Sequence, residues 1–243
     1  MFDGIVFIHA FPLDGSMWAD QLEEFGKRTK VLAPSLPGFG GAPPTGEVMT
    51  MSAAADQVAR AMHEATMSRA VVCGLSMGGY VALALWRQYP ELVDGFVFAN
   101  TKANADDESA KERRRQLAAR LRAEGSSFLV ESPPPLLSNE APAGLLERVK
   151  RFIAAQPAEA IAAASLGMAE RPDSTPDLAT ITVPTLVITG SKDTLIPPDA
   201  TKPLAEGIAG AHYGVIEGAG HLSNLEAPEQ FNDLLRVYLE RVR

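Results

Sequence analysis

A serine between two glycines is the residue of this chain best placed to do chemistry. Residues 74–78 read Gly-Leu-Ser-Met-Gly, which matches the pattern G-x-S-x-G, between an apolar run and a segment of helical character. Small residues two positions on either side let the backbone turn sharply at the serine, and a following helix directs its positive end at the site. The spacing therefore predicts Ser76 as a nucleophile. A glycine-rich turn that only packs closely is the alternative.

A histidine must accept the serine proton, because serine is a weak nucleophile without a base. Of the four histidines, His221 lies in the loop after the last apolar run. Sites in parallel sheets form at the carboxyl ends of strands, which favours His221 as the base. His9 directly ends the first apolar run, where we expect a packed structural residue, and we expect His63 and His212 at the surface.

A carboxylate must orient the imidazole and stabilise its cation. Asp193 comes just past the fifth apolar run, in the sequence Gly-Ser-Lys-Asp at 190–193. The end of the fourth run is the alternative place for the acid, but Asn100 stands there and Asp106 is several residues further along. The sequence therefore predicts Asp193 as the acid, between the serine and the histidine in chain order.

Short apolar runs that do not alternate with polar residues provide the elements for this site. They are rich in Val, Ile and Phe, which is typical of strands buried on both faces, and they cover 5–8, 30–33, 70–73, 95–98, 185–188 and 213–216. Helical segments separate most of them, at 17–25, 52–66 (with Ser52 as its N-cap), 78–88, 198–208 and 228–241. The alternation predicts an α/β fold with a doubly wound, mostly parallel sheet of about six strands flanked by helices.

One interval, 104–176, contains no convincing strand. Helical patterns cover 108–124, 143–155 and 157–169, with a proline-rich breaker at 132–135. Because this is too long for a loop, we expect a helical cap at 104–176 on a core domain formed by 1–103 and 177–243. The apolar cap residues expected against the core are Phe128, Leu136, Leu137, Phe152, Leu166 and Met168.

The charged residues of the cap are expected to face solvent. Arg113, Arg114 and Arg115 could pair with a substrate carboxylate, but a solvated helix face balanced by neighbouring glutamates is the favoured interpretation. All the residues predicted to do chemistry lie outside 104–176. Excision of the cap is therefore expected to leave the catalytic residues assembled and to change substrate selectivity.

Composition excludes several classes of protein. The chain has 243 residues, 46% of them apolar and 21% charged, which is enough to bury a core and excludes disorder as the main state. A net charge of −8 argues against binding to nucleic acid or to an anionic membrane. The single cysteine, Cys73, excludes an intrachain disulfide and a CxxC zinc cluster, and we expect no metal and no organic cofactor.

The ends and apolar stretches of the chain carry no sign of a membrane or secretory segment. No apolar stretch reaches the roughly 18–20 residues that a bilayer requires, and the first residues lack the basic region of a signal peptide. We therefore expect a cytoplasmic protein, as a monomer or a homodimer.

Several further motifs resemble one family. His-Ala-Phe-Pro at 9–12 resembles an oxyanion-strand motif, with Ala10 in place of the usual glycine, and Pro-Gly-Phe-Gly at 37–40 is similar to the loop after the second strand. The run 183–190 with its following aspartate resembles the acid strand. The residues that resemble the C-terminal signature are His221, Asn224, Glu226, Pro228 and Phe231. Over nearly its whole length the chain resembles the α/β-hydrolase fold family, specifically its small capped esterase, enol-lactonase and haloperoxidase-like members.

The resemblance implies further site residues. It carries over an oxyanion hole formed by two backbone N–H groups, those of Phe11 and Met77, which would stabilise a developing alkoxide. Many members begin with an antiparallel pair of strands, whereas four residues precede Ile5 here. This departure favours a six-stranded sheet instead of the usual eight strands.

Together these observations favour a serine hydrolase that cleaves a carboxylic ester or lactone through an acyl-enzyme, with a small-molecule substrate. A C–C bond hydrolase acting on a diketone and a cofactor-free perhydrolase share the same triad and remain alternatives. A ligand-binding receptor on a hydrolase fold is an alternative of a different class. Dehalogenases and epoxide hydrolases are disfavoured, because those relatives carry an aspartate where Ser76 stands.

Overall fold

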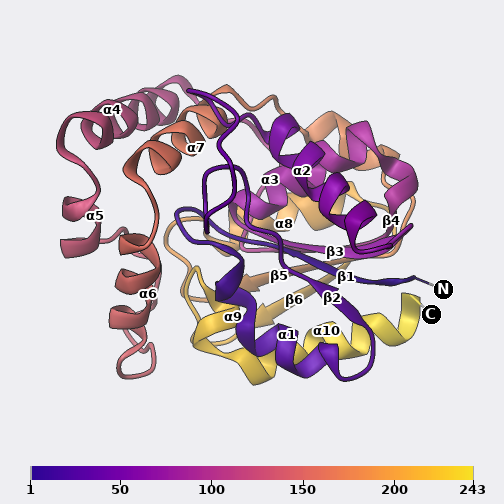
Figure 1. Ribbon diagram of the computed structural model, residues 1–243. Coiled ribbons are helices and arrows are strands. Elements are labelled where there is room, and N and C mark those ends of the chain that lie inside the picture. The colour runs from indigo at the N-terminus through magenta and orange to yellow at the C-terminus, as the bar shows by residue number, and fades with distance from the viewer. Residues whose placement is uncertain (1, 243) are drawn as a thin grey trace.

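A computed structural model describes residues 2–242 and contains one parallel sheet of six strands (Figure 1). The strands lie in the order β2-β1-β3-β4-β5-β6, and every neighbouring pair is parallel. Their bounds are β1 (Gly4–Ile8), β2 (Lys30–Leu32), β3 (Ala70–Leu75), β4 (Val93–Ala99), β5 (Thr185–Gly190) and β6 (His212–Ile216). The chain runs from β1 to β2 on one side and then to β3 on the other. The direction of winding therefore reverses between β1 and β3, where ligands bind in such sheets.

Helices cover both faces of the sheet, which confirms the predicted doubly wound α/β fold. One face carries α1 (Ala19–Gly26) and α10 (Pro228–Val242), and the other carries α2 (Met51–Glu64), α3 (Met77–Gln88) and α8 (Pro198–Gly207) (Figure 1). A short helix, α9 (Ser223–Glu226), precedes α10. Three 3₁₀ turns complete the elements, η1 (Gly15–Trp18), η2 (Pro90–Leu92) and η3 (Thr175–Thr180).

The core lies between the sheet and these two layers. β1 and β3 are buried along their whole length, as their unbroken apolar sequences predict. Trp18 is fully buried, with its ring centroid 5.0 Å from that of Phe7 and 5.8 Å from that of Phe231. These contacts join β1 to α10 through Trp18, the last residue of η1.

Element boundaries differ from the prediction at α2. The helix begins before Ser52, because the hydroxyl of Thr50 accepts a hydrogen bond from the Ala53 N–H at 3.1 Å and so takes the N-cap position. Ser52 is a helical residue whose hydroxyl donates to Gln88 at 2.6 Å. The N-cap assignment to Ser52 was therefore wrong by two residues.

A helical insertion, defined as residues 104–176, joins β4 to β5. It contains α4 (Glu108–Glu124), α5 (Ser127–Glu131), α6 (Leu145–Ala154) and α7 (Ala158–Glu170), and η3 begins at its end. Figure 1 shows these helices beyond the carboxyl ends of the strands, with α4 alongside α7. The sequence predicted α4, α6 and α7 but not the short helix α5.

Among residues 2–242, no single helix is long and apolar enough to cross a membrane. The pair α6 and α7 reaches that length and composition only when taken together, across a bend of 95°.

Candidate active site

Ser76 occupies a sharp turn between β3 and α3. Its backbone has φ 55° and ψ −114°, a left-handed conformation that a non-glycine residue rarely adopts. A Cβ atom added at Gly74 would lie 2.3 Å from the Gly78 carbonyl oxygen, and one added at Gly78 would lie 2.1 Å from the Ile8 carbonyl oxygen. Both glycines are therefore required by close approach of the backbone, as the spacing G-x-S-x-G predicts.

His221 and Asp193 are hydrogen-bonded to each other in the structure. His221 Nδ1 lies 2.8 Å from Asp193 Oδ2, and both side chains are almost completely buried. Asp193 comes from the loop after β5 and His221 from the loop after β6, so neighbouring parallel strands bring them together. An imidazole held at Nδ1 directs its other nitrogen, Nε2, away from the carboxylate.

The Asp193 carboxylate accepts three further hydrogen bonds. Oδ1 accepts from the backbone N–H groups of Leu195 and Ile196, each at 2.9 Å, and Oδ2 accepts from the Asn100 amide at 2.9 Å. Burial alone would raise the pKa of Asp193, but the bond to His221 and these donors hold that pKa below its ordinary value. Asp193 is therefore ionised at neutral pH and acts as an acceptor only.

Asn100 is a positioning residue that the sequence reasoning passed over. It follows β4 with φ 47°, is fully buried, and donates its amide to the Gly220 carbonyl at 3.2 Å as well as to Asp193. Its Oδ1 accepts from the Ser223 hydroxyl at 2.6 Å. The Asn100 amide thus links Asp193 to Gly220 and Ser223, which flank His221 in the loop after β6; we call this loop the histidine loop. Asparagine tolerates the left-handed conformation better than most residues, which was the available signal.

A cavity of about 370 Å³ contains the predicted residues. Ser76, His221 and Phe11 line it, at the junction of the sheet and the helical insertion. The remaining lining residues are Tyr80, Lys102, Asp106, Ala110, Arg113, Arg114, Leu117, Pro134, Leu136, Met168, Leu195 and Ile196. The structure therefore brings Ser76, His221 and the Phe11 loop to one site, with Asp193 behind the histidine.

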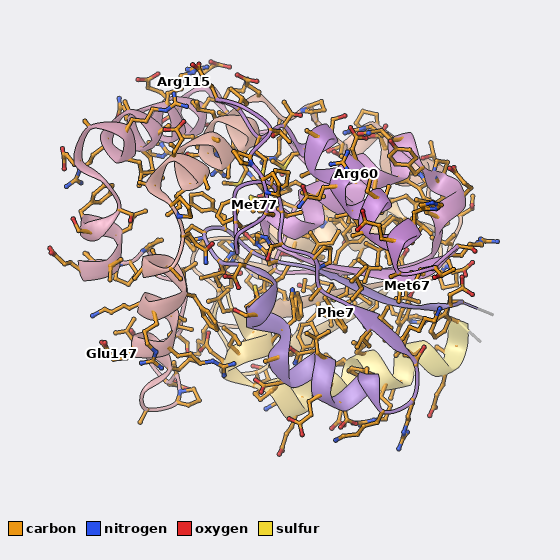
Figure 2. The ribbon with its side chains drawn as sticks, viewed as in Figure 1. Phe7, Arg60, Met67, Met77, Arg115 and Glu147 are labelled. Carbon is orange, nitrogen blue, oxygen red and sulfur yellow. The ribbon has the colours of Figure 1, made fainter. Side chains whose placement is uncertain are left out.

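Two backbone N–H groups are predicted to form an oxyanion hole, those of Phe11, which lines the cavity, and of Met77, which follows Ser76 and has a fully buried side chain. Met77 is the first residue of α3, near the centre of the molecule in Figure 2, and Phe11 follows β1. Within residues 2–242, neither N–H donates a hydrogen bond to another protein group. An oxyanion hole needs donors of this kind.

His9 is a structural residue, as expected. It is fully buried; its Nε2 accepts from the Leu36 N–H at 2.9 Å and its Nδ1 faces the Ala10 carbonyl at 3.0 Å. Both contacts fit the neutral tautomer that carries its proton on Nδ1. Burial lowers the pKa of His9 to about 4. His63 and His212 are exposed, also as expected.

The interpretation of the three arginines of α4 as a solvated face was wrong for Arg114, whose side chain is 24% exposed. Arg113 and Arg114 line the cavity, and Arg114 Nε pairs with Asp106, whose side chain is 3% exposed. Arg113 and Arg115 are both exposed, as expected; the NH1 atom of Arg115 lies 3.2 Å from Glu112, and its side chain is at the outer edge of α4 in Figure 2. The packing of α4 against α7 decides which side faces the cavity.

Some of the apolar residues of the insertion line the cavity and others lie outside its wall. Leu136 and Met168 line the cavity and are buried. Phe128 and Phe152 lie outside the cavity wall, beneath the guanidinium groups of Arg120 and Arg148, at 3.8 and 5.6 Å from the ring centroids.

Hydrogen bonds tie the insertion to the histidine loop. The Ser138 N–H and hydroxyl donate to Glu226 Oε2 at 3.0 and 2.6 Å, while Glu226 Oε1 accepts from the Gly220 N–H at 2.9 Å. The Leu222 N–H donates to the Leu136 carbonyl at 3.0 Å. The residues on both sides of His221 thus depend on the insertion. Excision of 104–176 would remove these supports, contrary to the expectation that the catalytic residues would stay assembled.

No group of three or more His, Cys, Asp or Glu residues that could hold a metal ion lies among residues 2–242.

Comparison with known proteins gives a consistent result. The sequence model of the alpha/beta hydrolase family matches residues 5–234. The 3-oxoadipate enol-lactonase 2 of Acinetobacter baylyi is 28% identical over 243 residues, covering 98% of this chain and 88% of the relative. Among solved structures, a thermophilic esterase from Thermogutta terrifontis with malate bound is 39% identical with a TM-score of 0.94, covering 98% of this chain and 90% of that one. The enol-lactonase from Burkholderia xenovorans LB400 is 27% identical with a TM-score of 0.86, covering 99% and 92%.

Proposed function

The chain belongs to the alpha/beta hydrolase family and is a carboxylic-ester hydrolase, and from that premise we propose that it cleaves esters or lactones through an acyl-enzyme on Ser76. The observation that carries the proposal is the buried 2.8 Å contact between His221 and Asp193, beside a cavity that Ser76 shares with His221. A base held in this way, beside a serine that has a strained backbone and lines the same cavity, suits nucleophilic catalysis.

Acylation begins when His221 Nε2 accepts the proton of the Ser76 hydroxyl. Oγ attacks the substrate carbonyl carbon, and the electron pair of the C=O bond moves onto its oxygen. The N–H groups of Phe11 and Met77 donate to this oxyanion, and removing one such donor in a comparable enzyme costs about 3–4 kcal/mol. The tetrahedral intermediate collapses, and His221 gives its proton to the departing alkoxide.

Deacylation repeats these steps with water as the nucleophile. His221 accepts a proton from water, the resulting hydroxide attacks the acyl carbon, and Ser76 leaves with the proton that His221 returns. Asp193 remains ionised throughout, holds the Nδ1–H, and stabilises the imidazolium that forms in each half of the reaction. With a lactone, the leaving alkoxide stays attached to the product.

Residues 104–176 act in this proposal as a cap, with 1–103 and 177–243 as the core domain. The cap supplies apolar cavity wall through Leu117, Leu136 and Met168, and it restricts water access to the acyl-enzyme. Because Leu136 also accepts from the Leu222 N–H, the cap supports the histidine loop in addition to binding substrate.

Replacement of Ser76 with alanine tests the proposal. Turnover of short-chain nitrophenyl esters should fall by roughly 10⁶-fold, the scale of triad loss in the best-studied case, with the circular dichroism spectrum unchanged. The control is Ser68→Ala, at an exposed turn, which should keep wild-type turnover. Phenylmethylsulfonyl fluoride should add to Ser76 alone, as peptide mass spectrometry can locate. Activity retained by Ser76→Ala would refute the assignment of the nucleophile.

A panel of esters, lactones and 1,3-diketones distinguishes the reaction types that share this triad. Ester or lactone cleavage should exceed diketone cleavage in kcat/KM. Preferred cleavage of the diketone would replace the proposal with a C–C bond hydrolase.

A further inference from the structure

The cavity that holds Ser76 and His221 carries an excess of positive charge. Its charged lining residues, apart from the histidine, are the cations Lys102, Arg113 and Arg114 and the carboxylate of Asp106. These sum to +2, although the whole chain carries a net charge of −8. A concave site whose sign opposes that of the whole chain attracts ligands of the other sign.

The one carboxylate of this set is already shared among several cations. Asp106 Oδ1 lies 2.8 Å from an Arg171 guanidinium nitrogen and 3.4 Å from Lys102 Nζ, and Oδ2 accepts from Arg114 Nε. These cations hold the pKa of Asp106 well below its ordinary value, although burial acts in the opposite direction. The single negative charge of Asp106 therefore faces the three positive charges of Lys102, Arg114 and Arg171, which leaves a net charge of +2 in this cluster.

The side chains of Lys102 and Arg114 are 22% and 24% exposed, so their charges are partly withdrawn from water. Partial burial of a cation costs free energy unless a counter-charge offsets it. Arg171 is buried, and its guanidinium lies 4.0 Å from the centroid of the Tyr80 ring. Because it is paired with Asp106, Arg171 already has a counter-charge. The unmatched charge therefore lies on the cavity side.

Arg113 adds a third cation at the exposed rim of the cavity. Its NH1 atom donates to the Ser109 hydroxyl at 2.6 Å, and within residues 2–242 no carboxylate oxygen lies within 4.0 Å of its guanidinium. The arginines of α4 that point elsewhere do have acidic partners. Arg115 pairs with Glu112, Arg120 with Glu124, and Arg122 with Glu159. Arg113, the arginine of α4 without an acidic partner within residues 2–242, thus lines the same cavity as Ser76.

We propose that the substrate is an ester or lactone that also bears a carboxylate, which Lys102, Arg113 and Arg114 bind while Ser76 attacks the scissile carbonyl. The inference rests on the proposed function. Guanidinium groups bind carboxylates through paired N–H donors, and the ammonium of Lys102 adds a point charge. Leu117, Leu136 and Met168 contact the carbon chain between the two groups. The substrate class is therefore the half ester, or the lactone acid, of a short dicarboxylic acid.

Two substrates that differ by one group test this directly. Monomethyl glutarate carries a terminal carboxylate where methyl pentanoate carries a methyl group. Wild-type kcat/KM should favour monomethyl glutarate by about tenfold or more, and Lys102→Gln and Arg113→Gln should each reduce that preference by about tenfold, because charge-assisted hydrogen bonds are lost. Arg115→Gln, on the same helix but paired with Glu112, is the control and should leave both values unchanged.

A charge reversal and a binding measurement complete the test. Arg113→Glu should favour methyl pentanoate over monomethyl glutarate, an outcome that a misfolded variant cannot produce. Calorimetry on Ser76→Ala should show glutarate binding more tightly than pentanoate, with the difference lost in the Ser76→Ala/Lys102→Gln double variant. Equal binding of the two acids, or a substrate preference that neither Lys102→Gln nor Arg113→Gln changes, overturns the inference. Absence of turnover with every ester would instead reject the proposed function, and the calorimetry would still decide the anion site.

Discussion

Replacing His9 with glutamine should change how the free energy of unfolding responds to acid. In the folded protein the pKa of His9 is about 4, because the ring is fully buried and its Nε2 accepts from the Leu36 N–H. In the unfolded chain the same ring has its ordinary pKa of 6.5. Between these two values the unfolded chain binds a proton that the folded protein does not. The free energy of unfolding therefore falls as the pH falls through this window.

The size of the effect follows from the two pKa values. The full difference of about 2.5 pKa units corresponds to roughly 3.4 kcal/mol, and about 2.5 kcal/mol of this is lost between pH 7.5 and pH 4.5. Glutamine cannot take up a proton but keeps an acceptor for the Leu36 N–H. The stability advantage of wild type over His9→Gln should therefore shrink by about 2.5 kcal/mol on acidification, because the other titrating groups are common to both proteins.

Urea unfolding curves at pH 7.5, 6.0 and 4.5 provide the measurement. His63→Gln, at an exposed position of α2, is the matched control and should follow the wild-type pH dependence. A difference between wild type and His9→Gln that stays constant across these pH values would refute the assignment of His9 as a buried neutral histidine.

Two further predictions concern the site. Asn100→Asp keeps a residue type that tolerates the left-handed backbone but removes the N–H donors to Asp193 and Gly220. In this variant kcat should fall by about 10–100-fold, with a smaller change in KM. The control, Asn104→Asp, is at an exposed position and should behave as wild type. Equal kinetics for Asn100→Asp and wild type would show that this amide does not position the acid. Met168→Ala should enlarge the cavity and shift the preferred acyl chain to a longer one, by about 1–3 kcal/mol in relative kcat/KM, while Phe152→Ala, outside the cavity wall, should leave the ranking unchanged. An unchanged ranking in Met168→Ala would exclude that residue from the substrate site.

The parts of the site that the sequence revealed are those that local rules govern. Ser76 stands out because a strand, a tight turn and a helix are adjacent in the chain, and the flanking glycines record the close approach of backbone atoms. Asp193 and His221 could be placed because the carboxyl ends of parallel strands share one edge. Each inference needed only neighbouring residues and a strand order that repeats across such folds.

The parts that the sequence did not reveal depend on contacts between distant segments. Arg114 lies three residues before Leu117 and seven before Leu121, so this spacing places it on the apolar side of α4, but the sequence alone does not show what that side packs against. That orientation comes from packing against α7, more than 40 residues away. The position of Asn100 was considered for the acid, and an asparagine there favoured Asp193 instead. Its role as a donor to Asp193 could not be predicted, because it depends on β4 and β5 being neighbours.

The hydrogen bonds from Ser138 to Glu226 have a consequence for exchanging segments between related enzymes. A graft that replaces the whole of 104–176 removes the donors to Glu226, and with them one anchor of the Gly220 backbone beside the histidine. A graft confined to 104–131, which contains α4 and α5, keeps those donors and carries the cationic side chains of α4. In the proposed function, the two arginines of α4 that line the cavity and the residues that support the loop of His221 therefore lie in separate stretches of the insertion, and we expect that new substrate ranges can be introduced through the first stretch while the second stays with its native core.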